Sequence, residues 1–164
     1  MPHKAHLYRV TVVWTGNRGV GTEDYRAYDR DHAIGALAKP SIEGSADAAF
    51  RGDPSRWNPE ELLVASISAC HKLWYLHLCA VAGVCVLAYE DNAEGLMEED
   101  DNGGGRFVQV ILRPRISLRA GGDVKLAARL HHDAHEKCFI ANSVNFPILF
   151  KPEFDSAPLG VAMR

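Results

Sequence analysis

Two cysteines of this 164-residue chain lie in helical patterns that are far apart in the sequence. Cys70 falls midway along an apolar segment, residues 58–80, and Cys138 falls in a second segment, residues 131–144. Two helices that each carry a thiol can pack against each other and bring the sulfur atoms together. This arrangement predicts a redox-active thiol pair, because disulfide chemistry needs two thiols within bonding reach.

Cys70 can also be interpreted as a small buried hydrophobic residue, because free cysteine is among the residue types most often buried. Burial alone raises the pKa of a thiol and leaves it unreactive. A reactive Cys70 therefore requires a cation nearby. The sequence offers Arg18 in a glycine-rich turn, and Arg51 and Arg56 in the loop before the helix.

The other two cysteines, Cys79 and Cys85, have no arginine or histidine at suitable spacing, so we interpret them as packing residues. The sequence contains no C-x-x-C pair, which excludes a zinc ribbon and a thioredoxin-type motif. A structural disulfide framework is not expected in a chain that lacks the features of a secreted protein.

Composition and charge are those of an ordinary globular chain, with 47% hydrophobic residues, 24% charged residues and a net charge of −3. The acidic balance leaves no basic surface for phosphates and argues against nucleic-acid binding. The N-terminus carries no signal-peptide pattern, and the longest apolar stretch, residues 78–88, is about half of what a bilayer requires. We expect one domain over residues 1–164, with a loose tail at 155–164, in the cytoplasm and without membrane contact.

A helix over residues 59–81 organises the predicted fold. Asn58 can cap its N-terminus, Glu60 faces the positive end of the helix dipole, and Gly83 ends it. One stripe of this helix is predicted to face the core. Its members are Pro59, Leu62, Leu63, Ser66, Cys70, Leu73, Trp74, His77, Leu78 and Val81.

Strands are predicted on both sides of this helix. Residues 6–14 and 22–28 are typical of a hairpin around a glycine turn, followed by an irregular segment over 29–54. After the helix we expect a strand over 84–90, an acidic hairpin tip within 91–105 and a strand over 106–119. A second helix is predicted over 123–137, followed by a short helix over 138–144 and a strand over 145–154. The residues expected to point inward from the second helix are Ala127, Leu130, His131, Ala134 and Cys138.

The segment NPEELLVASISAC, which ends at Cys70, resembles the central-helix motif of the OsmC/Ohr family, the osmotically inducible and organic hydroperoxide resistance proteins. The segment CFIANS, which begins at Cys138, resembles the second cysteine segment of that family. The order of elements also matches, so the resemblance covers nearly the whole chain. It implies an α+β, OsmC-like fold, with antiparallel sheets wrapped around two central cysteine-bearing helices in an intertwined homodimer.

The resemblance implies a thiol peroxidase, a peroxiredoxin-like oxidoreductase of the stress response that needs no cofactor and reduces organic hydroperoxides. Cys70 would become a sulfenic acid, Cys138 would resolve it as a disulfide, and a lipoyl-type or small dithiol would restore both thiols. The family's activating arginine matches Arg18, with Arg56 second, and its anchoring glutamate matches Glu60. Two features depart from the family pattern: the residue after the second cysteine is phenylalanine where relatives often carry proline, and the arginine loop differs in length between branches.

Glu60 and Cys70 are ten residues apart, which is about 15 Å along one helix. An arginine that bridged both within one chain would be stretched. We therefore predict a two-fold dimer in which a second subunit donates the arginine–glutamate pair. The plainer interpretation of Glu60 is a charge that stabilises the helix N-terminus by up to about 1 kcal/mol.

Apolar side chains near Cys70 predict a preference for bulky alkyl or lipid peroxides over hydrogen peroxide. These side chains are Ile67, Leu73, Trp74, Trp57 and Phe139. Core packing is the alternative interpretation, above all for Leu73.

Histidines offer a competing site. His131 and His135 lie one helical turn apart, and Cys138 follows three residues later, so a metal-binding face completed by His71 or His77 is geometrically possible. No second tight ligand pair accompanies these residues, and we predict no metal.

Two other classes of function stay open. Acyl transfer by Cys70 with His71 as base is disfavoured, because neighbouring helix residues point about 100° apart. A small-ligand or lipid-binding module whose cysteines only pack is the non-enzyme alternative. Replacing Cys70 by serine distinguishes this module from a peroxidase.

Overall fold

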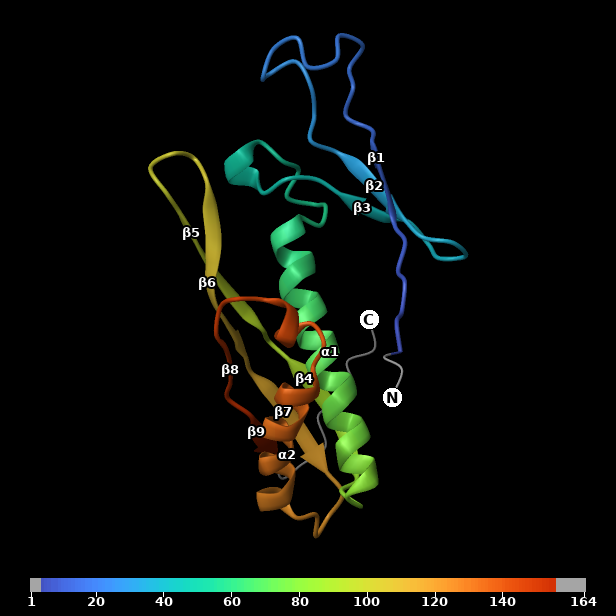
Figure 1. Cartoon of the computed structure of the whole chain (residues 1–164), viewed down its shortest axis with the longest axis vertical. Helices are drawn as coiled ribbons and strands as arrows, with labels where there is room; N and C mark the ends of the chain where they lie inside the picture. Colours follow the sequence, from blue (N-terminus) through green and yellow to red (C-terminus); the bar gives the residue numbers. More distant parts are fainter. Residues whose placement is uncertain (1–3, 156–164) are drawn as a thin grey trace. The chain divides into compact units, whose positions relative to one another are not determined.

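The computed structural model describes residues 4–155. The chain divides into two compact units, an N-terminal unit, Met1–Leu62, and a C-terminal unit, Leu63–Arg164. We describe each unit by itself, with the order of elements along the chain shown in Figure 1. The tail predicted over 155–164 lies outside the described residues except for Asp155, which belongs to the last strand.

The N-terminal unit contains an antiparallel sheet of β1 (Thr11–Trp14), β2 (His32–Gly35) and β3 (Ile42–Gly44), followed by the 3-10 helix η1 (Ala48–Phe50). The predicted strand over 22–28 is wrong, because β1 pairs with β2 instead. The segment between them folds as turns. Asn17 Oδ1 accepts hydrogen bonds from the backbone N–H groups of Gly19 and Gly21, at 2.8 and 3.0 Å. Such local side-chain bonds to the backbone compete with a sheet ladder.

The long helix α1 (Pro59–Val81) confirms the predicted helix. Asn58 Oδ1 accepts a hydrogen bond from Glu61 N at 2.7 Å, and Glu61 Oε2 accepts one from Asn58 N at 3.3 Å. These two bonds form a reciprocal cap of the kind in which a short polar residue is followed three positions later by glutamate. Gly83, with φ of 76°, ends the helix in the left-handed conformation that glycine adopts without steric cost.

The predicted core stripe of α1 is correct only in part, because Leu63, Trp74 and Leu78 pack against the core clusters while other members are exposed. The residues that α1 buries are Ile67, His71, Tyr75 and Cys79. Leu73 is 63% exposed and Val81 is 74% exposed, although hydropathy alone would place both inside. The difference arises because a histidine occupies the buried face, where it is paired with another histidine from α2. By length and composition alone α1 could also cross a membrane, but the core helix of a soluble protein meets the same test.

The C-terminal unit contains two three-stranded sheets. One has the order β4 (Val86–Asp91), β7 (Pro114–Leu118) and β9 (Glu153–Asp155), and the other the order β5 (Glu94–Glu99), β6 (Gly105–Leu112) and β8 (Ile148–Phe150). Each sheet joins an antiparallel pair to a last strand that runs parallel to its neighbour. The sheets are therefore mixed, whereas antiparallel sheets were predicted.

Two predicted strands are each divided. The segment 106–119 breaks at Arg113, whose backbone N–H donates to Asp91 Oδ1 at 2.7 Å instead of continuing a ladder. The segment 145–154 forms β8 and β9, which belong to different sheets. The acidic segment 91–105 contains an additional strand, β5, before its tip.

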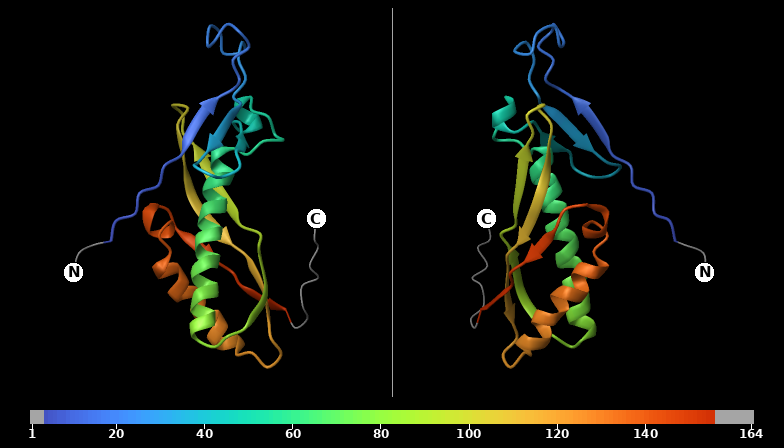
Figure 2. Two further views of the ribbon diagram at one scale, coloured as in Figure 1. Left: turned by 90° about the vertical axis from the view of Figure 1, so that its right-hand side faces the viewer. Right: turned by 60° about the vertical axis from the view of Figure 1, so that its left-hand side comes forward.

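The second helix, α2 (Val124–Lys137), confirms the predicted helix, with Asp123 Oδ1 capping it through Leu126 N at 2.9 Å. The short η2 (Ala141–Ser143) follows. Both views of Figure 2 show α1 and α2 side by side within the C-terminal unit. One core cluster, around Tyr75, contains residues of both helices with Val84 and Ile116, and the other joins Ile67 of α1 to β6 and β8.

Candidate active site

Cys70 and Cys138, here called the cysteine pair, meet within the C-terminal unit. Cys70 lies on α1 and is partly buried, whereas Cys138 directly follows α2 and is completely buried. Both thiols are free, and the side chain of Cys138 hydrogen-bonds that of Cys70. The two thiols thus lie within interaction range of each other, and of the two residues only Cys70 is partly exposed.

The surroundings of Cys138 keep its thiol protonated. Burial, followed by the hydrogen bond to Cys70, raises the pKa of Cys138 to about 11. Ala141 N also donates a hydrogen bond to Cys138 Sγ at 3.4 Å, which acts in the opposite direction. At neutral pH Cys138 is therefore a neutral thiol that can donate a hydrogen bond to the sulfur of Cys70.

The apolar residues predicted near Cys70 have different environments. Ile67 is fully buried in the core and cannot contact a substrate. Trp74, one turn after Cys70 on α1, packs edge-on against Phe139 at 5.7 Å between ring centroids, and Phe139 is 69% exposed. Lys137, which sequence reasoning missed, brings its Nζ to 6.0 Å from the Trp74 ring. Trp57 belongs to the N-terminal unit.

Glu60 lines a cavity of the N-terminal unit, here called the Glu60 cavity, with a volume of about 390 Å³. Its walls are formed by Trp14, Thr22, Tyr28, Arg30, His32, Ser45, Ala46, Asp47, Phe50, Pro59 and Glu60. Glu60 Oε2 is buried and has no hydrogen-bond partner among residues 4–155. A buried carboxylate oxygen without a donor is costly, so this atom is suited to receive a cation or a hydrogen-bond donor.

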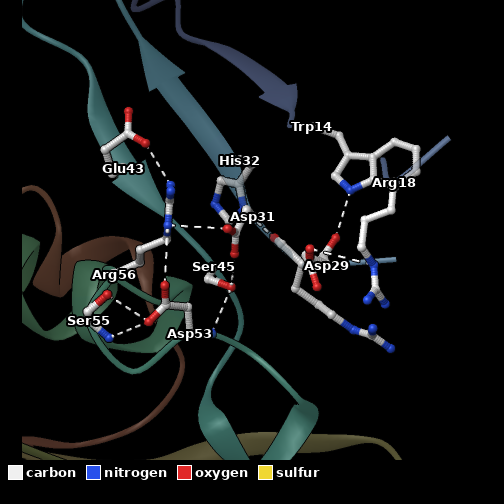
Figure 3. Close-up of polar contacts among 11 residues, drawn as sticks. Trp14, Arg18, Asp29, Asp31, His32, Glu43, Ser45, Asp53, Ser55 and Arg56 are labelled. Atoms are coloured by element: carbon white, nitrogen blue, oxygen red, sulfur yellow. Dashed lines mark hydrogen bonds and ion pairs between the residues drawn. The ribbon is translucent and has the colours of Figure 1, made fainter. Parts of the chain in front are cut away.

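Arg18 does not line the Glu60 cavity. Its Nε donates to the carbonyl oxygen of Ala27 at 3.2 Å, and its Nη2 donates to that of Arg26. Its carboxylate partner is Asp29, with Nε 3.7 Å from Oδ2 (Figure 3). The side chain of Arg18 is half exposed.

The other two predicted arginines are engaged differently. Arg56 lies among three carboxylates, with Glu43 at 2.6 Å, Asp31 at 3.3 Å and Asp53 at 3.6 Å (Figure 3). These neighbours neutralise its charge and raise its pKa, first through the hydrogen bond to Glu43. Arg51 adopts a left-handed φ of 64° at the end of η1 and lies 5.9 Å from the Tyr25 ring centroid.

Arg30 is an arginine that sequence reasoning missed. Its guanidinium lies 4.2 Å from the ring centroids of both Tyr25 and Tyr28 and donates to the carbonyl oxygens of the same two residues. It lines the Glu60 cavity. Within the described part of the chain, Arg30 forms no ion pair with a carboxylate. The spacing of two tyrosines before an arginine is the sequence signal that could have identified it.

His71 and His131, here called the imidazole pair, connect α1 to α2. His71 Nε2 and His131 Nδ1 lie 2.9 Å apart, the rings are within 6° of parallel, and both residues are at most 1% exposed. Burial first, and then neighbouring imidazoles, lowers the pKa of His71 to about 4 and that of His131 to about 3. The pair is therefore neutral at neutral pH.

The predicted alternatives for the histidines gain no support. Between residues 4 and 155 there is no group of three or more side chains placed to hold a metal ion. The hydrogen-bonding partner of the His71 ring is His131. Two buried ring nitrogens, His131 Nε2 and His135 Nδ1, lack a hydrogen-bond partner among the described residues.

Solved structures share this architecture. An OsmC-like protein of unknown function from Vibrio cholerae is 28% identical, with a TM-score of 0.81 over 90% of this chain and 99% of that chain. An organic hydroperoxide resistance protein OsmC from Legionella pneumophila is 18% identical, with a TM-score of 0.64 over 92% and 98%. An organic hydroperoxide resistance protein from Elizabethkingia anophelis is 20% identical, with a TM-score of 0.66 over 94% and 100%. These similarities confirm the predicted α+β, OsmC-like fold.

Comparison of sequences gives a family. No curated protein sequence matches the chain. The family model described as OsmC-like protein matches residues 52–153, which include both members of the cysteine pair. Because this match spans more than half of the sequence, the chain belongs to the OsmC-like protein family.

Proposed function

We propose that this protein is a cysteine-based peroxidase that reduces organic hydroperoxides to alcohols. The observation that carries the proposal is the contact between two free thiols with unequal exposure. Cys70 is the partly exposed sulfur and is the one a peroxide can reach, whereas Cys138 is buried behind it. A reactive thiol and a resolving thiol need this asymmetry, since only the first must meet the substrate.

The proposed reaction has three steps. The Cys70 thiolate attacks the outer oxygen of the hydroperoxide, the O–O bond breaks, and the alkoxide leaves as an alcohol after taking up a proton. Cys138 then attacks the Cys70 sulfenic acid, which forms the disulfide and releases water. A dithiol reductant, of the lipoyl type or a small dithiol, reduces the disulfide and restores both thiols.

Arg18 is the proposed activating cation and Glu60 its proposed anchor. The unpartnered Oε2 of Glu60 supports a role in holding a guanidinium. Arg30 competes with Arg18 for this role, because it already lines the Glu60 cavity. Arg56 is a weaker candidate, since three carboxylates neutralise its charge.

The protein is further proposed to act as a single OsmC-like domain in a cytoplasmic homodimer. Organic hydroperoxides are the proposed substrates, in line with the naming of the Legionella and Elizabethkingia structures as organic hydroperoxide resistance proteins. Trp74 and Phe139 are the proposed apolar contacts for the organic group. Bulky alkyl hydroperoxides are therefore preferred over hydrogen peroxide.

Peroxide consumption in the presence of a dithiol tests the proposal. The native protein is expected to consume cumene hydroperoxide faster than hydrogen peroxide, and Cys70→Ser is expected to abolish turnover. Cys85→Ser is the matched control, because Cys85 is also partly buried but lies outside the cysteine pair. Undiminished consumption by Cys70→Ser, or none by the native protein, would refute the peroxidase.

A second candidate function is a small-ligand-binding module without thiol chemistry. The Glu60 cavity favours it, because a volume of about 390 Å³ walled by aromatic and polar side chains is typical of a ligand site. In this case Cys70→Ser would leave ligand binding unchanged, whereas changes at Glu60 would weaken it.

A further inference from the structure

The imidazole pair joins the same two helices that carry the cysteine pair. His71 directly follows Cys70 on α1, and His131 precedes Cys138 by seven residues along α2. The C-terminal unit thus contains two polar contacts between these helices, one between sulfur atoms and one between ring nitrogens. The proposed peroxidase chemistry uses only the first.

These two contacts fix how the helices cross. Consecutive residues of α1 point about 100° apart, while seven residues of α2 span about 10 Å along its axis. The contacts Cys70–Cys138 and His71–His131 can coexist only at one rotation of α1 and one crossing of α2 over it. A change at the imidazole pair is therefore transmitted to the distance between the two sulfur atoms.

The imidazole pair is suited to a fixed geometry because aromatic rings hold it on several sides. The Tyr75 ring stacks on the His131 ring with 3.9 Å between their centroids. The ring centroid of Phe150, in β8, lies 5.8 Å from that of His71 and 6.0 Å from that of His131. Phe154 of β9 contacts His131 at 6.4 Å. Rings packed this tightly cannot turn without disturbing their neighbours.

We propose that His71 and His131 are positioning residues, whose hydrogen bond holds α1 and α2 in the register that brings Cys138 to Cys70 for disulfide formation. The inference rests on the proposed function in one respect, namely that the cysteine pair forms a disulfide in the reaction. In that step Cys138–SH and Cys70–SOH give the disulfide and one water. The imidazole pair takes no part in the bond changes.

Equilibration with a glutathione redox buffer measures the positioning without any peroxide. In this reaction the dithiol form and oxidised glutathione give the Cys70–Cys138 disulfide and two reduced glutathione molecules, and the equilibrium constant reports the effective concentration of one thiol at the other. We expect His131→Phe to lower this effective concentration about tenfold or more, since small misplacements of two reacting groups greatly reduce how readily they react. His131→Gln, whose amide can still hydrogen-bond to His71, is expected to recover most of it.

The control is His132→Phe, because His132 is an exposed neighbour on α2 whose ring meets Phe150 edge-on at 5.0 Å between centroids, a contact that phenylalanine can keep. This variant is expected to stay within about twofold of native. Should His131→Phe fail to fold, the double variant His71→Phe/His131→Phe removes both hydrogen-bonding groups at once, which costs less stability than leaving one unpaired. A folded double variant with the native effective concentration would overturn the proposal, as would an equal loss in His132→Phe. Absent peroxide turnover in the native protein would refute the proposed function and leave this measurement intact.

Discussion

The two thiols of the cysteine pair have different surroundings. Cys138 is completely buried, and its pKa is raised to about 11, first by burial and then by the hydrogen bond to Cys70. Cys138 therefore keeps its proton at neutral pH.

Replacement of the buried sulfur should separate the two chemical steps. In Cys138→Ser, Cys70 can still react with a hydroperoxide, but no partner thiol is present to form the disulfide. One equivalent of peroxide should be consumed without sustained turnover, and mass spectrometry should detect Cys70 with one added oxygen atom. Sustained turnover at the native rate in this variant would contradict the role of Cys138.

At the scale of elements, the buried contact between α1 and α2 is made by histidines, although hydropathy would place apolar residues there. His71 and His131 are buried and neutral, while Leu73 and Val81 face solvent. A buried imidazole disfavours its charged form, so protonation opposes folding. The stability of the helix pair must then depend on pH.

The imidazole pair predicts a loss of stability in mild acid. Both histidines have lowered pKa values in the folded state, about 4 and about 3, against an ordinary value of 6.5. Above pH 6.5 neither state binds these protons and the effect is absent. As the pH falls from 6.5 towards 4, the unfolded state binds more protons, and each contributes about 1.4 kcal/mol of destabilisation per pH unit.

Urea unfolding between pH 4.5 and 7.5 can measure this dependence. The free energy of unfolding should decrease towards acid in the native protein and should change less in His71→Phe/His131→Phe. The difference between the two proteins isolates the imidazole pair from the carboxylates, which titrate in both. Parallel curves would show that the pair does not control acid stability.

The helices could be predicted from local sequence signals, whereas features of the fold that depend on long-range contacts could not. Asn58 and Asp123 cap α1 and α2 through residues three positions away, so a short window of sequence contains the information. The buried face of α1 could not be predicted from such a window, because His71 is buried by a partner 60 residues later.

The candidate site shows the same division between local and distant information. The motifs around Cys70 and Cys138 identified the cysteine pair through their resemblance to a family. The arginine that lines the Glu60 cavity could not be identified in this way, because the contacts of Arg18 and Arg30 depend on how the loop over residues 15–31 folds. That loop is held by bonds between its own side chains and backbone, which a hairpin pattern does not reveal.

At the scale of the whole molecule, α1 carries two opposite stripes in the C-terminal unit. One is the buried stripe of Ile67, His71, Tyr75 and Cys79. The other is exposed and mostly apolar, and its members are Ala65, Ala69, Leu73, His77 and Val81. Small and aliphatic residues at four-residue spacing form a ridge suited to packing against another helix. This ridge supports the proposed homodimer.

A charge on the ridge should weaken the dimer. Leu73→Glu is expected to shift the protein towards monomer in light scattering at micromolar concentration, because the carboxylate would lose its water on association. Val124→Glu is the control, since Val124 is also an exposed apolar residue but lies on α2. The same mass in solution for the native protein and Leu73→Glu, whether both are monomers or both are dimers, would count against this interface.

The parallel pairing of the last strands has a consequence for how the chain acquires its structure. β8 joins β6 and β9 joins β7 across 38 residues, with α2 in the intervening connection. Such distant pairings must wait for a large loop to close, and chains rich in them reach the native state slowly. During synthesis the strands β6 and β7 leave the ribosome with one edge unpaired, and Cys138 follows before that edge is covered. The thiol that ends up most protected is therefore briefly among the most accessible, so an oxidising cell can trap the nascent chain in a wrong disulfide.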